Sequence, residues 1–200
     1  SGNVNITASA STFAATDVGR LVSFSNGRAK ITGFTSATLV AATTQDNFDN
    51  TNAVTNWKLG AFSGTTGHPS CVSFFEQRLV FAGTTNEPQT LYFSKSGDYE
   101  NMTAGTNADD AMIYTIASNQ VNRIRYLKAQ RTLIVGTTGG EFTVSADGTD
   151  AAITPSNIVI KKQSSYGTAN VDAIAAGNAV LFLQKAKRKI RELSYNFDTD

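Results

Sequence analysis

The feature that most constrains the fold of this 200-residue chain is a short segment that occurs twice. Residues 78–85 have the sequence Arg-Leu-Val-Phe-Ala-Gly-Thr-Thr, and residues 131–138, which begin 53 positions later, have the sequence Arg-Thr-Leu-Ile-Val-Gly-Thr-Thr. A unit that repeats at about 50 residues is typical of β-propeller blades and related arrays. Because one such unit cannot bury both faces of its own sheet, the repeat predicts a stack of sheets, with function on loops, in a channel or at a rim.

The composition favours an all-β protein. Charged residues make up only 16% of the chain, and short runs that alternate apolar and polar residues are separated by turn-forming residues. The net charge of +1 gives no general attraction to nucleic acid or to a membrane surface. No stretch of about 18 apolar residues is present, so we expect no membrane span. Cys71 is the only cysteine, which excludes an intrachain disulfide.

Residues 1–60 are predicted to form a small β-barrel or sandwich domain. The dipeptide Asn26-Gly27 stands between two alternating runs and predicts a hairpin, because both residues tolerate positive φ. Trp57 is the expected anchor of the core of this domain. Residues 61–70 are rich in glycine and predict a linker.

Residues 61–200 are predicted to form an incomplete β-propeller of four-stranded antiparallel blades. The blades cover about residues 70–118, 119–165 and 166–200, and the last one is incomplete. Propellers close with about four to eight blades, so we expect a fragment of a longer protein, or a piece that a partner completes. The predicted strands are 71–77, 78–84, 90–95 and 111–118, then 122–129, 132–137, 141–145 and 158–164, then 171–175, 179–184 and 189–195.

Several segments of the chain resemble the tail tubular protein B family, the nozzle proteins of short-tailed bacteriophages. Each segment is short, but together they follow the family's order and spacing over most of residues 57–195. The matching segments are 57–63 (Trp-Lys-Leu-Gly-Ala-Phe-Ser), 67–69 (Gly-His-Pro), 75–84, 88–94, 97–102, 133–137, 140–142, 154–157 and 163–167.

The resemblance implies a structural component of the virion tail, assembled in the cytoplasm of the host, from a free phage or a prophage. Family members form a homo-oligomeric ring, usually a hexamer, whose channel passes DNA during genome ejection. The implied partners are other tail proteins, on the adaptor and portal side and at the distal tip or fibres. The resemblance carries over no catalytic residue, cofactor or metal, and we expect no enzymatic activity. Family members are several-fold longer than this chain.

A carbohydrate-binding or depolymerising propeller is the main alternative, and a bacterial surface or sensor propeller is a third. Sugar-cleaving enzymes need two opposed carboxyl groups, and aromatic side chains stack on sugars. The spacing of the acidic residues does not show that any two face one cleft, and we expect most of the aromatics to pack between blades. The candidates are Glu76, Asp98, Glu100, Asp109, Asp110 and Glu141, with the aromatics Phe74, Phe75, Phe81, Tyr92, Phe93 and Tyr99.

Three further motifs have a structural interpretation that we favour over a chemical one. His68 and Cys71 form a conceivable base and nucleophile pair, but a turn histidine and a buried cysteine are the simpler interpretation. The glycine-rich segment 136–140 lacks the Lys-Ser/Thr ending of a phosphate-binding loop. The segment 147–150 offers oxygen ligands for calcium but does not match the EF-hand pattern.

The clearest charged cluster flanks the turn between the last two predicted strands. It is the candidate site for nonspecific contact with phosphate groups or with an acidic neighbouring subunit. A solvated hairpin tip that discourages edge pairing is the alternative interpretation. The cluster consists of Lys185, Lys187, Arg188, Lys189 and Arg191.

Overall fold

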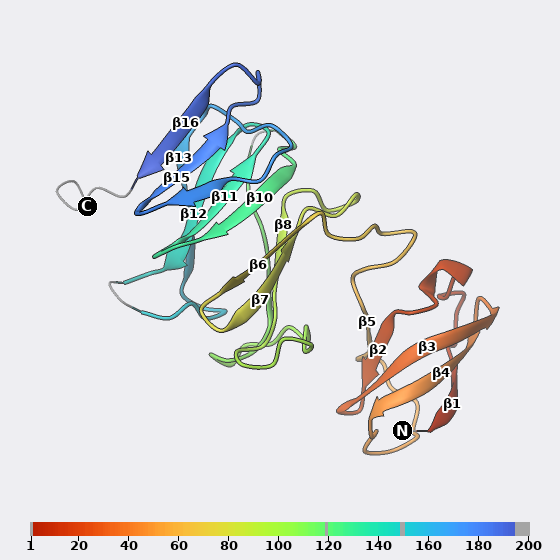
Figure 1. Cartoon of the computed structure of the whole chain (residues 1–200). Coiled ribbons are helices and arrows are strands. Elements are labelled where there is room, and N and C mark those ends of the chain that lie inside the picture. Colours follow the sequence, from red (N-terminus) through yellow and green to blue (C-terminus); the bar gives the residue numbers. More distant parts are fainter. Residues whose placement is uncertain (1, 119, 149–150, 195–200) are drawn as a thin grey trace. The chain divides into compact units, whose positions relative to one another are not determined.

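The computed structural model describes the whole chain except residues 1, 119, 149–150 and 195–200 (Figure 1). The regular elements of this described part are the strands β1–β16 and one turn of 3-10 helix, η1 (Ala15–Asp17). The protein is therefore all-β, as predicted. The chain divides into two compact units, Ser1–His68 and Pro69–Asp200, which are described separately.

The first unit is one antiparallel sheet with the strand order β1-β4-β3-β2-β5. Alternate residues of the inner strands, among them Ile31 and Val40, are buried and form the core with Phe13. Because β1 and β5 are the edges, this is a single open sheet and not the closed barrel or two-sheet sandwich that the sequence predicted. The strands are β1 (Asn3–Thr7), β2 (Leu21–Phe24), β3 (Gly27–Ser36), β4 (Leu39–Asp46) and β5 (Lys58–Leu59).

The predicted hairpin between β2 and β3 is present, but its turn lies one residue earlier than expected. Phe24 pairs with Gly27, so the turn residues are Ser25 and Asn26, with φ of +44° and +58°. Gly27 is the first residue of β3 and is needed for a different reason, since a Cβ at this position would collide with the ring of Phe48.

Trp57 does not anchor the core of the first unit, and this prediction was wrong. Its side chain is 38% exposed and its ring lies 6.3 Å from that of Phe13, which is itself buried. The buried cluster of Phe13, Ile31 and Val40 forms without it. The tryptophan is consequently left at the rim.

The second unit consists of three antiparallel meanders that follow one another along the chain. Each of their strands overlaps a predicted one, although the strand predicted at 171–175 begins three residues later. The predicted strand 189–195 corresponds to β16, and residue 195 lies outside the described residues. The sheets are β6 (Cys71–Phe75), β7 (Arg78–Ala82), β8 (Thr90–Phe93) and β9 (Met112–Thr115); β10 (Ile124–Ala129), β11 (Leu133–Thr137), β12 (Gly140–Ala146) and β13 (Ile158–Ser164); and β14 (Ile174–Ala176), β15 (Ala179–Leu183) and β16 (Ile190–Ser194).

The three sheets of the second unit pack face to face in chain order. A large apolar cluster, which includes Val80, Phe93 and Val144, lies between the first and second sheets. A smaller cluster, which includes Ile134 and Phe182, lies between the second and third sheets. Burial of these faces supplies most of the driving force for the stack.

The repeated segments form the second strand of the first and second sheets, but not in the register that the sequence suggests. An offset of 53 equates Val80 with Leu133, yet both side chains lie in the cluster between these two sheets. If each sheet were related to the next by the same rotation and translation, equivalent residues would point in the same direction along the stack. The turn before the strand has two residues after Phe75 and three residues after Ala129. The extra residue shifts the structural register by one.

Candidate functional site

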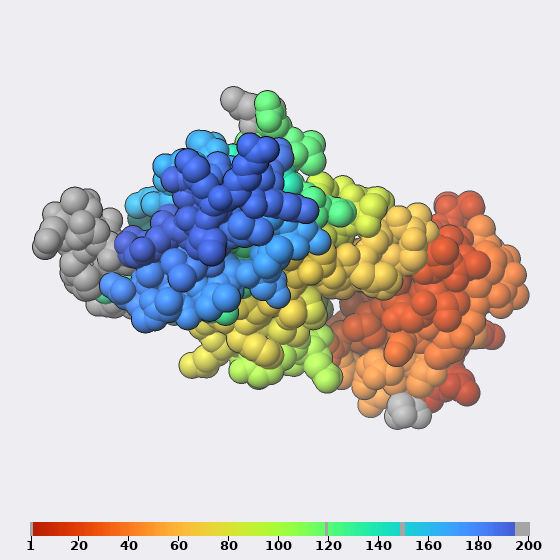
Figure 2. All heavy atoms as spheres, turned by 45° about the horizontal axis from the view of Figure 1, so that its top comes forward, coloured from red at the N-terminus to blue at the C-terminus, as the bar shows by residue number. Residues whose placement is uncertain are grey.

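The predicted basic cluster lies on the hairpin between β15 and β16, at the top of Figure 1. Leu183 pairs with Ile190, and Lys187 turns the chain with φ of +57°. Figure 2 shows this hairpin in dark blue on the face of the molecule turned to the viewer. The residues of the cluster whose side chains are exposed are Lys185, Lys187, Arg188 and Lys189.

Arg191 is held differently from the other four cations. It lies on β16 rather than on the turn, and its guanidinium carbon is 4.0 Å from the centroid of the Tyr166 ring. Its Nε also donates a hydrogen bond of 3.2 Å to Oε1 of Gln184. This arginine therefore fastens the hairpin to its surroundings, and the four turn residues supply the free charge.

The surroundings of the hairpin are strongly basic. Residues 151–194 contain seven lysines and arginines but only two carboxylates, Asp172 and Glu192. In the described part of the chain, the recorded ion pairs involve other residues and none includes a cation of this hairpin. Exposed cations of this kind contact phosphate or carboxylate groups without sequence preference, and salt weakens the contact.

The loop that follows β8 holds four of the six candidate carboxylates, and it is organised as a structural loop. Nζ of Lys95 lies 2.9 Å from a carboxylate oxygen of Asp109 and 3.9 Å from one of Asp110. The hydrogen bond from Lys95 holds the pKa of Asp109 below its ordinary value, which opposes a role as general acid. Asp98 and Glu100 are exposed.

Arg78 holds this loop in place through hydrogen bonds to its backbone. It is only 2% exposed, and its guanidinium donates hydrogen bonds to the carbonyl oxygens of Ser94 (2.8 Å), Ala108 (2.7 Å) and Asp110 (2.7 Å). Burial lowers its pKa, but a guanidinium remains charged at all ordinary pH values. The carboxylate of Glu76, on the neighbouring turn, accepts a hydrogen bond of 2.7 Å from the N–H of Ile153.

Glu141 is fully buried in a polar row on the face of the second sheet that packs on the third. Register places Tyr126, Gly136, Glu141 and Ser164 side by side across four strands. The hydroxyl of Ser164 donates to Oε2 of Glu141, whereas Oε1 of Glu141 and the hydroxyl of Tyr126 have no hydrogen-bond partner within the described residues. Burial raises the pKa of both groups. The candidate with the raised carboxyl pKa is thus the one that no substrate reaches.

The remaining motifs serve the fold. Cys71 is half-buried in the second unit, and burial raises the pKa of its thiol, which opposes nucleophilic chemistry; His68 belongs to the first unit and is exposed. In the glycine-rich hairpin, the N–H of Gly139 donates to Oγ1 of Thr137 at 3.3 Å, so this donor is used internally. The proposed calcium segment includes residues 149–150, which lie outside the described residues.

Fewer of the six candidate aromatics than predicted pack between sheets, since only Phe75 and Phe93 belong to the cluster between the first two sheets. Tyr92 is 6% exposed and Phe81 is half-buried, and both lie on the opposite face of the first sheet. Phe74 and Tyr99 are 59% and 44% exposed, and their rings meet edge to face at 5.2 Å. The adjacent residues Phe74 and Phe75 lie on opposite faces of β6, as strand geometry requires.

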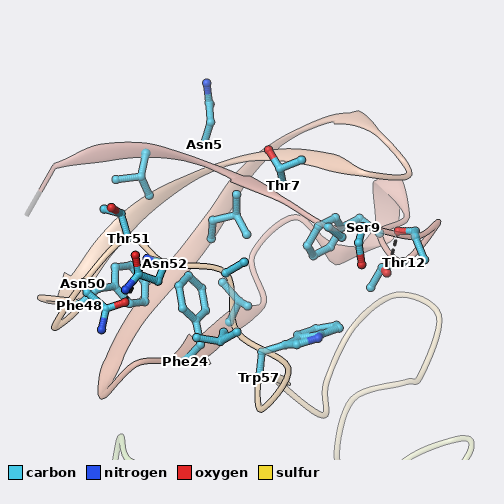
Figure 3. Close-up of a pocket in the computed structure, with 18 residues that line it drawn as sticks. Asn5, Thr7, Ser9, Thr12, Phe24, Phe48, Asn50, Thr51, Asn52 and Trp57 are labelled. Atoms are coloured by element: carbon cyan, nitrogen blue, oxygen red, sulfur yellow. Dashed lines mark hydrogen bonds between the residues drawn. The ribbon is translucent and has the colours of Figure 1, made fainter.

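The first unit contains a pocket that no sequence pattern predicted (Figure 3). It has a volume of about 790 Å³ and lies between β1, β2 and the segment that joins β4 to β5. Its wall includes Phe24, Phe48 and Trp57. The only sequence signal at this place is the series of asparagines at positions 47, 50 and 52.

Comparison with protein-family models and curated proteins assigns no role to these residues. No protein-family model and no curated protein matches the chain. In the part of the chain that the structure describes, no group of three or more His, Cys, Asp or Glu side chains is placed to hold a metal ion, and no helix is long and apolar enough to cross a membrane.

Proposed function

We propose that this chain is a non-enzymatic structural protein, part of a β-propeller of the kind found in the tail nozzles of short-tailed phages. The observation that carries the proposal is that the stack of three sheets is open at both ends, with apolar side chains on its two outer faces. The sequence resemblance to the nozzle family supplies the particular kind of propeller.

The outer face of the first sheet is apolar across all four strands. Register aligns Val72, Phe81, Tyr92 and Ile113 in one row. Val72 is 59% exposed and Ile113 is 50% exposed. A sheet whose two faces are both apolar belongs in the interior of a layered structure, because each apolar face must be covered.

The outer face of the third sheet also carries apolar side chains, although register places Glu192 and Ser194 on the same face. Ile174 is 68% exposed and Ile190 is 74% exposed, while Leu181 and Leu183 between them are half-buried. Covering a large aliphatic side chain is worth about 1.5–3 kcal/mol, so further sheets at both ends would be strongly favoured. Continuation of the array in both directions leads to a closed propeller.

In this proposal the sheets act as a rigid wall and the hairpin tips act as docking points. The basic hairpin at 184–189 would contact an acidic neighbouring subunit, or DNA in passing. The use of Arg78, Glu76, Lys95 and Asp109 in structural contacts supports a role without catalysis. The partners would be further copies in a hexameric ring and the adjoining tail proteins.

Immunogold electron microscopy with antibodies raised against this chain tests the proposal. We expect label on the tails of short-tailed virions produced by the source strain. Labelling confined to bacterial surfaces, with unlabelled virions, would contradict the proposal. A reducing-sugar assay on capsular polysaccharide provides the second arm, in which we expect no cleavage by the protein and therefore no difference between it and the Glu76→Ala or Asp98→Ala variant.

A further inference from the structure

We propose that the pocket of the first unit binds a neutral mono- or disaccharide. This inference does not rest on the role proposed for the second unit. The volume of the pocket, about 790 Å³, lies within the range of roughly 300–1,000 Å³ that is typical of small-molecule sites. The chemistry of the wall decides which class of small molecule fits.

The wall of the pocket carries no charge. None of the eighteen lining residues, all of them described by the structure, is Asp, Glu, Lys, Arg or His. A charged ligand would lose its hydration here without gaining an opposite charge, at a cost of several kcal/mol. Nucleotides, phosphosugars and acidic glycans are therefore disfavoured, and an uncharged ligand is selected.

Flat aromatic surfaces form one side of the pocket. The rings of Phe24 and Phe48 stack with centroids 4.3 Å apart and planes inclined by 14°. The absence of a side chain at Gly27 allows Phe48 to lie against the sheet. Trp57 adds a further ring whose side chain is 38% exposed. Such rings give a sugar's C–H face a preformed apolar surface, and they lose little conformational entropy on binding.

Polar side chains lie at the two ends of the pocket (Figure 3). Asn50, Thr51 and Asn52 lie at the end beside Phe48, and Ser9 and Thr12 lie at the other end. Oδ1 of Asn50 accepts a hydrogen bond of 3.0 Å from the backbone N–H of Asn52, which fixes this turn of the chain. The amide of Asn52 offers both a donor and an acceptor, as a sugar hydroxyl requires. Apolar rings between polar ends favour a saccharide over a purely apolar ligand.

The single tryptophan makes the proposal directly measurable. Trp57 is the only tryptophan of the chain and lies in the pocket wall, so its fluorescence reports on occupancy. The 200-residue chain is titrated with N-acetylglucosamine, maltose and cellobiose, and with glucuronic acid as the charged counterpart. We expect a saturable change with at least one neutral sugar and none with glucuronic acid. Absence of a saturable change with all three neutral sugars, or an equal response to glucuronic acid, overturns the proposal.

A matched pair of variants assigns the binding to the pocket. Asn52→Ala removes an amide at the end of the pocket (Figure 3), and Asn47→Ala removes an exposed amide of the same segment that does not line the pocket. We expect Asn52→Ala to weaken binding about tenfold, the worth of one or two hydrogen bonds, and Asn47→Ala to leave it unchanged. Thr51→Val, which deletes a hydroxyl at the same end, replaces Asn52→Ala if that variant does not fold. Equal affinity of the pocket variant and Asn47→Ala contradicts the assignment.

Discussion

The strands β7 and β11 have nearly the same eight-residue sequence pattern, yet equivalent residues of the two copies have different roles. Both are second strands of four-stranded meanders, and both send alternate side chains into the apolar cluster between the first two sheets. Arg78, at the start of one copy, is buried and donates to several backbone carbonyls. Arg131, at the start of the other copy, is exposed in the turn before its strand.

The glycines of the two copies also differ. Gly83 follows the end of β7 with φ of +71°, a conformation that side chains rarely adopt. Gly136 lies inside β11 with an ordinary φ, and a Cβ there would collide with the ring of Tyr126. One glycine is required by backbone conformation and the other by space. Sequence similarity in a β array therefore identifies equivalent strands, but it does not identify equivalent residues.

Among the substitutions that test this difference, Arg78→Ala is expected to have the largest effect on the free energy of unfolding. Arg78→Ala leaves at least three backbone carbonyls without their charged donor and should lower the free energy of unfolding by about 3 kcal/mol or more. Urea denaturation measures the change. A loss below about 1 kcal/mol would show that water replaces the guanidinium without penalty.

Gly136→Ala is expected to have the next largest effect. The new methyl group must displace the Tyr126 ring from a well-packed site, at a cost of about 2 kcal/mol. The control is Gly33→Ala on β3, where a Cβ would meet its nearest neighbour at an ordinary 3.6 Å, and we expect a change within about 0.5 kcal/mol. Equal losses in the two variants would mean that the collision with the tyrosine ring does not decide the cost.

Glu141→Gln tests whether the buried carboxyl between the second and third sheets makes the stability of the protein depend on pH. The raised pKa of Glu141 means that the folded state favours the protonated carboxyl, so stability is highest at acidic pH and declines as pH rises from the ordinary carboxyl value through the raised one. Glutamine does not ionise and should remove this part of the decline. Melting temperatures across pH should show the variant more stable than the parent near neutrality only. The same advantage at acidic pH would contradict ionisation as the cause.

Arg131→Ala has the smallest expected effect. Because Arg131 is exposed, its removal should change the free energy of unfolding by about 0.5 kcal/mol or less. The same urea titration used for Arg78→Ala provides the measurement. Similar losses in the two arginine variants would restore the residue-by-residue equivalence that the sequence repeat suggests.

Local patterns predicted the strands of the second unit well, because alternating residues and turn-forming residues act over a few positions. The register of the repeat could not be predicted from the sequence, because the turn before β11 has one residue more than the turn before β7. One extra residue moves every side chain of the following strand to the opposite face of the sheet. The burial of Arg78 depends on carbonyls 16 to 32 residues away. The pocket depends on Phe48 and Trp57, which lie in irregular chain and meet the sheet only in the folded state.

The central claim is that the three-sheet stack is part of a larger array whose outer faces are covered. A cryo-electron microscopy structure of the assembled particle that contains this chain tests it most directly. The account predicts that further four-stranded sheets cover Val72 and Phe74 at one end of the stack and Ile174 and Ile190 at the other. The account is contradicted if these four side chains, each at least 59% exposed in the isolated chain, remain in solvent in the assembly.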